Sequence, residues 1–271
     1  MTRPPARHRI ALVGAPDGLA GLEPALSAHR IALERVPVLT FRAVGGPALL
    51  RQLHRFGSPD ALLVGSGRAI DFFVGAWLAP PSTARTVAWA VGATTAERMR
   101  RLGWRRVRTA PREGIEGAIA ALGPGRGRRL LYPRSDRAGP GAARLLRARG
   151  WNVWDPVVYR TETRGPLGAT ERRALETASA WIVTSPSALS AVRRRLGARR
   201  FGAVRRRMPV IALGERTLRA ARGHGFRRAE SVGSATVEAL TYYVVRRFAD
   251  GSPSPARTVS IPSPARPRRG A

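Results

Sequence analysis

A hydroxyl-rich turn between an apolar strand-like segment and a helix-like segment occurs twice in this chain. One copy runs from Ala180 to Leu189, and its residues Trp181 to Val183 are apolar and favour a strand. Ser185 is a good helix N-cap, and Pro186 is tolerated at the first helical position because that position needs no N–H donor. The segment therefore predicts a helix N-terminus whose free backbone N–H groups favour an anion.

The other copy runs from Ala61 to Ile70 and has the same order of residue types. Two further motifs downstream also recur in the same order. The matched pairs are Ser66 with Ser185, Gly92 with Gly214, and Glu116 with Glu238, at separations of 119, 122 and 122 positions. A separation of this size is that of a domain rather than of a solenoid repeat. The sequence thus predicts an internal duplication of a whole strand–helix–strand unit.

Composition excludes several kinds of chemistry. The chain has 271 residues, no cysteine and four histidines that are scattered along it, so it offers no disulfide, cysteine nucleophile or thiolate metal site. All 48 basic residues are arginine, which excludes a lysine Schiff base and a phosphate-loop lysine. No apolar run approaches the ~20 residues of a membrane span. We therefore expect a cytoplasmic protein without a membrane segment.

The net charge of +31 has two readings. An excess of arginine with alanine, glycine and proline is typical of GC-rich coding sequence. Guanidinium groups also suit carboxylates and phosphates, so anionic ligands are favoured. Nucleic-acid binding is disfavoured because no recognition motif occurs and the aromatic residues are not interleaved with the basic runs.

Strand-like and helix-like segments alternate with short turns along most of the chain, which predicts an α/β fold with parallel sheets. Two extended segments, Pro37–Arg42 and Pro156–Thr161, look alike and predict two crossings between domains that pair into a two-stranded linker. The expected organisation is a discontinuous first α/β domain at 1–36 plus 162–250, a second at 43–155, linker strands at 37–42 and 156–161, and a disordered basic tail at 251–271.

Local signals place several residues at the carboxyl ends of strands, where ligands bind in such sheets. These residues are Ser66, Gly92, Arg134 and Ser135. A helix is expected over Arg68–Leu78. Thr94 followed three residues later by Glu97 predicts a capping box at the start of the next helix.

The order of these motifs resembles the uroporphyrinogen-III synthase family, over about Arg9 to Ala249. The motifs that carry the resemblance are Asp60–Ser66 (DALLVGS), Ala90–Ala96 (AVGATTA), Gly150–Val153 (GWNV) with Tyr159 after it, Thr184–Ser185, Ala212–Thr217 (ALGERT) and a last helix containing Glu238. The resemblance implies two similar α/β domains joined by a two-stranded β linker, with the active cleft between them.

The resemblance also implies the reaction. A lyase of this family cyclises hydroxymethylbilane, a linear tetrapyrrole with eight carboxylates, to uroporphyrinogen III, with inversion of ring D and loss of water in porphyrin and heme biosynthesis. Positioning of the substrate should dominate such catalysis, because the uncatalysed ring closure proceeds without inversion. No metal or organic cofactor is implied. The small-molecule substrate is the expected partner, and a monomer is expected.

Site residues follow from the matched positions. Tyr159 matches the family's characteristic tyrosine, and its phenol can hydrogen-bond the departing hydroxyl; the alternative is a linker tyrosine packed at the hinge. The threonines after the two glycine turns have simple helix capping as their alternative role. The implied substrate-binding residues are Ser66, Gly92, Thr95, Arg134, Ser135, Arg137, Thr184, Ser185, Ser187, Gly214 and Thr217.

The sequence departs from the family pattern at two places. Val13-Gly14-Ala15-Pro16 stands where the family often has Thr-Arg after the first strand, and Gly65 replaces the usual threonine at the first hydroxyl turn. These departures leave open a second function, that of a non-catalytic regulatory paralogue that binds a tetrapyrrole or another anion.

Overall fold

The computed structural model describes residues 6–74, 85–110, 114–233 and 236–248. The chain divides into two compact units, which we call unit 1 (residues 1–40 and 163–271) and unit 2 (residues 41–162). The predicted tail at 251–271 and residues 75–78 of the predicted helix Arg68–Leu78 lie outside the described residues.

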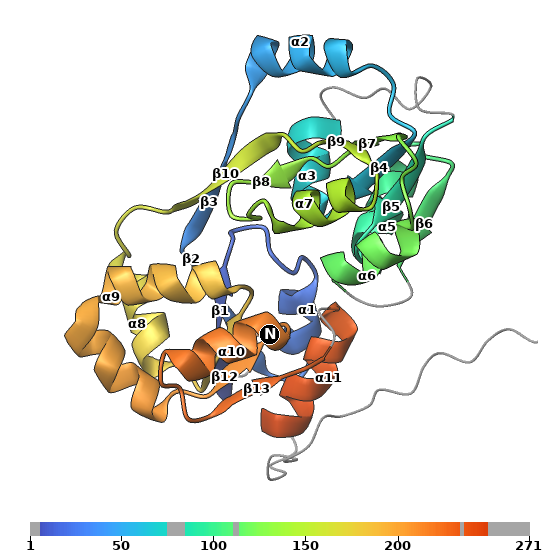
Figure 1. The fold of residues 1–271 in the computed structure, drawn as a ribbon. Coiled ribbons are helices and arrows are strands. Elements are labelled where there is room, and N and C mark those ends of the chain that lie inside the picture. The colour runs from blue at the N-terminus through green and yellow to red at the C-terminus, as the bar shows by residue number, and fades with distance from the viewer. Residues whose placement is uncertain (1–5, 75–84, 111–113, 234–235, 249–271) are drawn as a thin grey trace, which may run out of the picture. The chain divides into compact units, whose positions relative to one another are not determined.

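Unit 1 contains a five-stranded sheet in which every pair of neighbouring strands is parallel. Four of its strands, β1, β2, β12 and β13, are labelled in Figure 1. The strand order is β13-β12-β11-β1-β2, so the strand that carries the second hydroxyl-rich turn lies at the centre. The strands are β1 (His8–Gly14), β2 (Ile31–Pro37), β11 (Ala180–Val183), β12 (Val210–Ala212) and β13 (Ala229–Ser231).

Helices pack against both faces of this sheet, because successive strand residues point to opposite sides. Ile182 packs with Leu22 and Leu240 of two helices on one face. Its neighbour Trp181 contacts Phe226 on the other face, with ring centroids 5.5 Å apart. The helices of unit 1 are α1 (Leu22–Ser27), α8 (Ala169–Thr177), α9 (Pro186–Arg207), α10 (Glu215–Gly223) and α11 (Val237–Phe248).

Unit 2 contains a second five-stranded parallel sheet, with the order β6-β5-β4-β7-β9. The strand that carries the first hydroxyl-rich turn is again central. The strands are β4 (Ala61–Val64), β5 (Val87–Ala90), β6 (Val107–Thr109), β7 (Arg129–Leu131) and β9 (Asn152–Trp154).

The two faces of the unit 2 sheet have separate cores. Leu62 and Val64 pack with the helical residues Phe73 and Met99 on one face. Leu63 packs with Ile119 and Leu146 on the other face. Among the described residues, the helices of unit 2 are α2 (Gly46–Phe56), α3 (Gly67–Ala69), the π-helix η1 (Ile70–Val74), α5 (Ala93–Arg101), α6 (Ile115–Leu122) and α7 (Gly141–Ala148).

The repeated motifs occupy equivalent places in the two sheets. Strands β4 and β11 are central, and β5 and β12 are the next strands on the same side. Strands β1 and β2, at the start of the chain, hold the places in unit 1 that β7 and β9 hold in unit 2. This agreement supports a duplication followed by a permuted connection.

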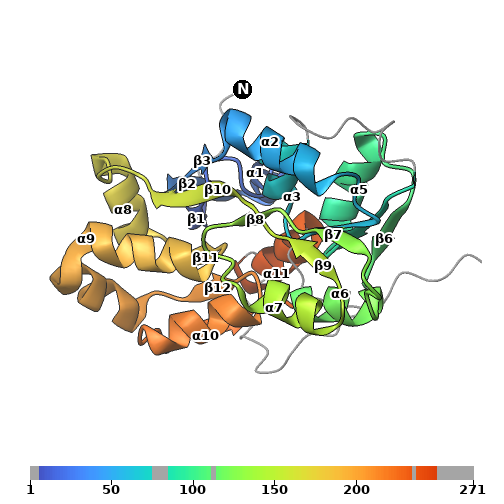
Figure 2. The same cartoon turned by 45° about the horizontal axis from the view of Figure 1, so that its top comes forward.

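The two segments predicted to pair into a linker lie in neighbouring strands of one sheet, but a third strand adds to them, so the predicted number of two strands is wrong. A three-stranded sheet forms in the order β3-β10-β8, with β3 (Leu39–Ala43), β10 (Val157–Thr163) and β8 (Arg134–Ser135) (Figure 2). The backbone N–H of Arg134 donates to the carbonyl of Pro156 at 3.0 Å, and that of Asp136 donates to the carbonyl of Tyr159 at 3.1 Å. The third strand was missed because it is only two residues long, Arg134 and Ser135, and so leaves no alternating pattern in the sequence.

Two local predictions also need correction. Gly92, and not Thr94, is the N-cap of α5, and no side chain caps that helix. Glu97 instead pairs with Arg101 at 3.3 Å, so the predicted capping box is absent from α5. The predicted helix from Arg68 begins as one α-helical turn and continues as the π-helix η1 over Ile70–Val74.

Candidate active site

Ser66 and Tyr159 meet at the carboxyl end of β4. Side chains alternate along a strand, so Ser66 continues the face of Leu62 and Val64, and Tyr159 belongs to the core on that same face. The Ser66 and Tyr159 hydroxyl oxygens are 3.1 Å apart and form a hydrogen bond in which either can donate. Ser66 therefore holds the phenol predicted to be catalytic at the end of the central strand.

The ring of Tyr159 is fixed by two aromatic neighbours and is only 7% exposed. Phe72 stacks on it with centroids 5.4 Å apart, and Phe41 meets it edge-on at 6.0 Å. The guanidinium of Arg68 lies 3.7 Å from the centroid of the Phe41 ring. The ring of Tyr159 is therefore packed, as expected for a linker tyrosine, whereas its hydroxyl lies beside Ser66 at the carboxyl end of β4.

Thr95 and Thr217 take the same place in the two units. Each is the third residue of its helix, follows a glycine N-cap, and is less than 10% exposed. No side chain makes a capping hydrogen bond at either helix, so capping by the threonine hydroxyls is wrong. A Cβ built on Gly92 or Gly214 would meet nothing within 4 Å, so the backbone is accessible there.

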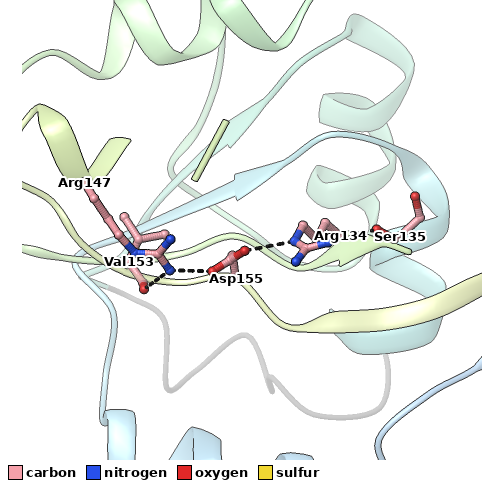
Figure 3. A network of polar contacts seen from close by, with 5 residues as sticks. All are labelled: Arg134, Ser135, Arg147, Val153 and Asp155. Carbon is pink, nitrogen blue, oxygen red and sulfur yellow. Dashed lines mark hydrogen bonds and ion pairs between the residues drawn. The ribbon is translucent and has the colours of Figure 1, made fainter. Parts of the chain in front are cut away.

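Arg134 and Arg137 are bound to the protein itself. Nε of Arg134 lies 2.9 Å from the Asp155 carboxylate, and both side chains are less than one-fifth exposed. Asp155 also pairs with Arg147 on its other oxygen, at 2.5 Å, so one carboxylate joins two guanidinium groups (Figure 3). Arg137 is half exposed and donates to the carbonyl of Thr161 at 3.2 Å. Ser135 follows Arg134 in β8, where it pairs in register with Tyr159.

Ser185 caps helix α9 as the sequence predicts. Its hydroxyl accepts a hydrogen bond from the backbone N–H of Ala188 at 3.2 Å and lies 3.0 Å from the hydroxyl of Ser187. Two hydroxyl groups therefore stand at the N-terminus of α9, at the end of the central strand β11. The arrangement can donate hydrogen bonds to an anion.

Thr184 faces the neighbouring strand β1. Its backbone N–H donates to the carbonyl of Val13 at 3.1 Å, and its hydroxyl donates to the same carbonyl at 3.3 Å. A Cβ on Gly14 would stand 2.3 Å from Oγ1 of Thr184. The glycine that departs from the family pattern at position 14 therefore leaves space for the side chain of Thr184 on the neighbouring strand.

Tyr132 was not predicted to be a site residue. It follows β7 and continues the face of Leu130, opposite to that of Tyr159, and its side chain is 5% exposed. Burial raises the pKa of Tyr132 above its usual 10.0, while the nearby Arg134 cation lowers it and Asp155 and Tyr159 raise it. The sequence could have indicated Tyr132, because it lies two positions after Leu130, on the same face of β7, at the carboxyl end of that strand.

A pocket of about 460 Å³ lies at the opposite edge of the unit 1 sheet, beside the residues that precede β11, β12 and β13. Its lining includes Arg207 and Arg247. Arg207 donates to the carbonyl of Glu176, near the end of α8, and Arg247 pairs with Glu230 at 3.3 Å. These arginines already have partners within the protein, and the pocket lies away from the carboxyl ends of the strands, where the candidate site residues lie.

The described residues hold no group of three or more histidine, cysteine or acidic side chains placed to bind a metal ion. In the same ranges, no helix combines the length and the apolar character needed to cross a bilayer.

Fold and site together define a class. The chain is an α/β protein with two parallel five-stranded sheets, each with one helix-opening serine past its central strand and one buried threonine in the helix that follows the next strand. The sequence matches the family model described as Uroporphyrinogen-III synthase HemD over residues 20–242. The chain belongs to the uroporphyrinogen-III synthase family.

Solved structures show the same fold. The chain is similar to a mutant uroporphyrinogen III synthase from the extremely thermophilic bacterium Thermus thermophilus, with 16% identity and a TM-score of 0.63, over 90% of this chain and 100% of that one. It is also similar to the uroporphyrinogen-III synthetase of Helicobacter pylori, with 16% identity and a TM-score of 0.60, over 89% of this chain and 99% of that one. No curated protein sequence matches the chain.

Proposed function

We propose that this protein is a lyase that cyclises hydroxymethylbilane to uroporphyrinogen III, with inversion of ring D and loss of water. The observation that carries the proposal is the family match over residues 20–242. The hydrogen bond between Tyr159 and Ser66 supports the proposal, because it orients a phenol donor at the end of the central strand.

Tyr159 assists departure of the substrate hydroxyl. The carbon–oxygen bond breaks with its electron pair on oxygen, the phenol proton passes to that oxygen so that it leaves as water, and the proton that the substrate loses on ring closure returns to the phenol oxygen. Ser66 can donate to the phenol oxygen while the phenol donates to the substrate, so the pair keeps the proton directed outward. The buried ring positions this donor before substrate arrives, which lowers the entropic cost of the reaction.

The eight carboxylates of the substrate need many donors, and the strand ends of both units provide them. Ser185 and Ser187 stand at the N-terminus of α9, and open glycine backbone precedes α5 and α10. Helix N-termini and hydroxyl groups suit carboxylates. Arg134 already has a carboxylate partner in Asp155, so we assign it to shaping the site, and we assign Arg137 to its rim.

The proposal also includes the division of the chain into domains and linker segments. Two similar α/β domains at 1–36 with 162–250 and at 43–155, connected by the segments 37–42 and 156–161, would each bind part of the substrate. The protein would act as a monomer in the cytoplasm without a cofactor.

The test couples the purified protein to a source of hydroxymethylbilane and separates the product isomers. An excess of the type III isomer is the expected result. Formation of the type I isomer alone, which arises without an enzyme, would contradict the proposal. Saturable binding of uroporphyrin together with type I product alone would instead favour the regulatory paralogue.

A further inference from the structure

A second phenol lies at the carboxyl edge of the unit 2 sheet, on the face opposite to Tyr159. Leu63 and Leu130 belong to the same core cluster as Tyr132, whereas Leu62, Leu131 and Tyr159 belong to the other cluster. Because side chains alternate along each strand, the two tyrosines flank the sheet where β4 and β7 end. Tyr132 nevertheless shares the electrostatic environment of the same edge, since Arg134, Asp155 and Tyr159 all act on it.

The hydroxyl of Tyr132 has no hydrogen-bond partner among the described residues. The side chain is 5% exposed, and a buried phenol normally finds a partner. Within the described ranges, two polar side-chain atoms are both buried from solvent and without a hydrogen bond, Glu34 Oε2 and Trp104 Nε1. Oη of Tyr132 is not one of them, so this unpaired oxygen is still in contact with solvent. The ring is packed in the protein while its donor is left available.

Gly65 keeps that donor uncovered. It is the next position after Ala61 and Leu63 on the same face of β4, and a Cβ there would stand 4.0 Å from Tyr132 Oη and 3.9 Å from Cε2. A larger side chain at this position would lie over the phenol. The glycine thus leaves a gap beside the hydroxyl, directly before Ser66.

The surroundings favour a negatively charged acceptor. Arg134 acts on Tyr132 electrostatically and is held in place by Asp155 at 2.9 Å. Asp155 is shared with Arg147, so two guanidinium groups accompany one carboxylate (Figure 3). Of the charged groups that act on Tyr132, Arg134 has the largest effect, ahead of Asp155 and Glu116, and a phenol O–H beside that guanidinium suits a carboxylate oxygen.

We infer that Tyr132 is a substrate-binding residue that donates a hydrogen bond to one carboxylate of the linear tetrapyrrole at the carboxyl edge of the unit 2 sheet. The inference rests on the proposed function and adds a residue to it. Tyr159 acts on the departing hydroxyl, whereas Tyr132 holds a side chain of the substrate that does not react. Loss of the Tyr159 hydroxyl should therefore lower kcat, whereas loss of the Tyr132 hydroxyl should raise KM.

The test compares Tyr132→Phe with the wild-type protein in the coupled assay. Phenylalanine keeps the ring in its core and removes only the donor. A hydrogen bond to a charged group contributes enough to change KM about tenfold or more, while kcat stays within about twofold because the bond is present equally in the bound substrate and the transition state. Tyr242→Phe, at a tyrosine that is 56% exposed on α11, is the matched control and should leave both parameters unchanged.

A second readout separates binding from turnover. Quenching of uroporphyrin III fluorescence gives the dissociation constant of a stable octacarboxylate, and this constant should rise by a similar factor in Tyr132→Phe. Wild-type protein that forms no type III isomer would contradict the proposed function itself. Active wild-type protein with an unchanged KM and dissociation constant in Tyr132→Phe would overturn the inference alone, as would a loss of activity that only follows a loss of folded protein in thermal unfolding.

Discussion

Single hydroxyl groups decide what the strand ends of this protein can do. Tyr159→Phe removes the phenol oxygen that lies 3.1 Å from Ser66 but keeps the packed ring. We expect kcat to fall by about 100-fold, the scale of a positioned proton donor, while the free energy of unfolding changes by only about 1 kcal/mol. The coupled isomer assay and urea unfolding give the two values.

Ser66→Ala provides the matching variant for this prediction. If the two hydroxyls act as one unit, the double variant should lose little more activity than Tyr159→Phe alone. Full activity in Tyr159→Phe would remove the residue from the mechanism.

Gly14 is expected to be intolerant of any side chain. In Gly14→Ala the new methyl carbon would stand 2.3 Å from Thr184 Oγ1, so either the threonine or the strand must move. Overpacking of this kind costs about 1–3 kcal/mol. The measurement is urea unfolding of Gly14→Ala, alone and in a Thr184→Ala background, where the cost should be smaller.

Gly202→Ala is the control for this prediction, because the glycine is helical and a Cβ there meets nothing within 4 Å. That variant should stabilise the protein by up to about 1 kcal/mol. Equal stability of Gly14→Ala and the wild type would contradict the packing argument.

At the scale of elements, the two hydroxyl-rich turns begin their helices in different ways. Ser185 accepts a hydrogen bond from Ala188 and opens the long helix α9, whereas Ser66 makes no capping bond and opens a single α-helical turn. The hydroxyl of Ser66 is used instead for Tyr159. The two equivalent serines therefore have different roles, because Ser185 caps a helix and Ser66 positions the phenol of Tyr159.

Ser185→Ala tests this division. Loss of the cap should lower the free energy of unfolding by about 1 kcal/mol, because a backbone N–H of α9 loses its acceptor. Thr94→Ala, at the residue that the sequence suggested as a cap, should be nearly neutral because no side chain caps α5. Denaturant unfolding of both variants is the measurement, and a larger loss in Thr94→Ala would reverse the assignment.

For the whole molecule, stability should fall on both sides of neutral pH. Burial, followed by the Arg193 and Arg205 cations, lowers the pKa of His224 below its usual 6.5. The unfolded chain then binds the proton more tightly, so the stability that this histidine contributes is present above pH 6.5 and is lost as the pH falls.

On the alkaline side, burial raises the pKa of Tyr243 above its usual 10.0, and the hydrogen bond to Glu230 raises it further. The folded state holds that proton more tightly, so the contribution is present below pH 10.0 and is lost above it. Urea midpoints across this range are the measurement. His224→Gln should flatten the acid side alone and Tyr243→Phe the alkaline side alone; unchanged curves would contradict the assignments.

Much of the fold could be read from local patterns. Alternation of apolar residues, proline after serine, and motifs recurring at 119 to 122 positions are properties of neighbouring residues or of a repeat, so they indicated parallel α/β units and the cap at Ser185. Helix ends were shifted by a few residues because capping depends on backbone geometry, as at Gly92.

Folding of the whole chain decided the rest, because contacts between distant residues leave no local pattern. Ser66 and Tyr159 are 93 positions apart, and Thr184 and Val13 are 171 apart. The pairing of β8 with β10, the sharing of Asp155 by two arginines and the placement of the Tyr132 hydroxyl arise in the same way. Residue types and strand periodicity thus define which groups are available at the sheet edges, and long-range packing defines which of them can bind a substrate.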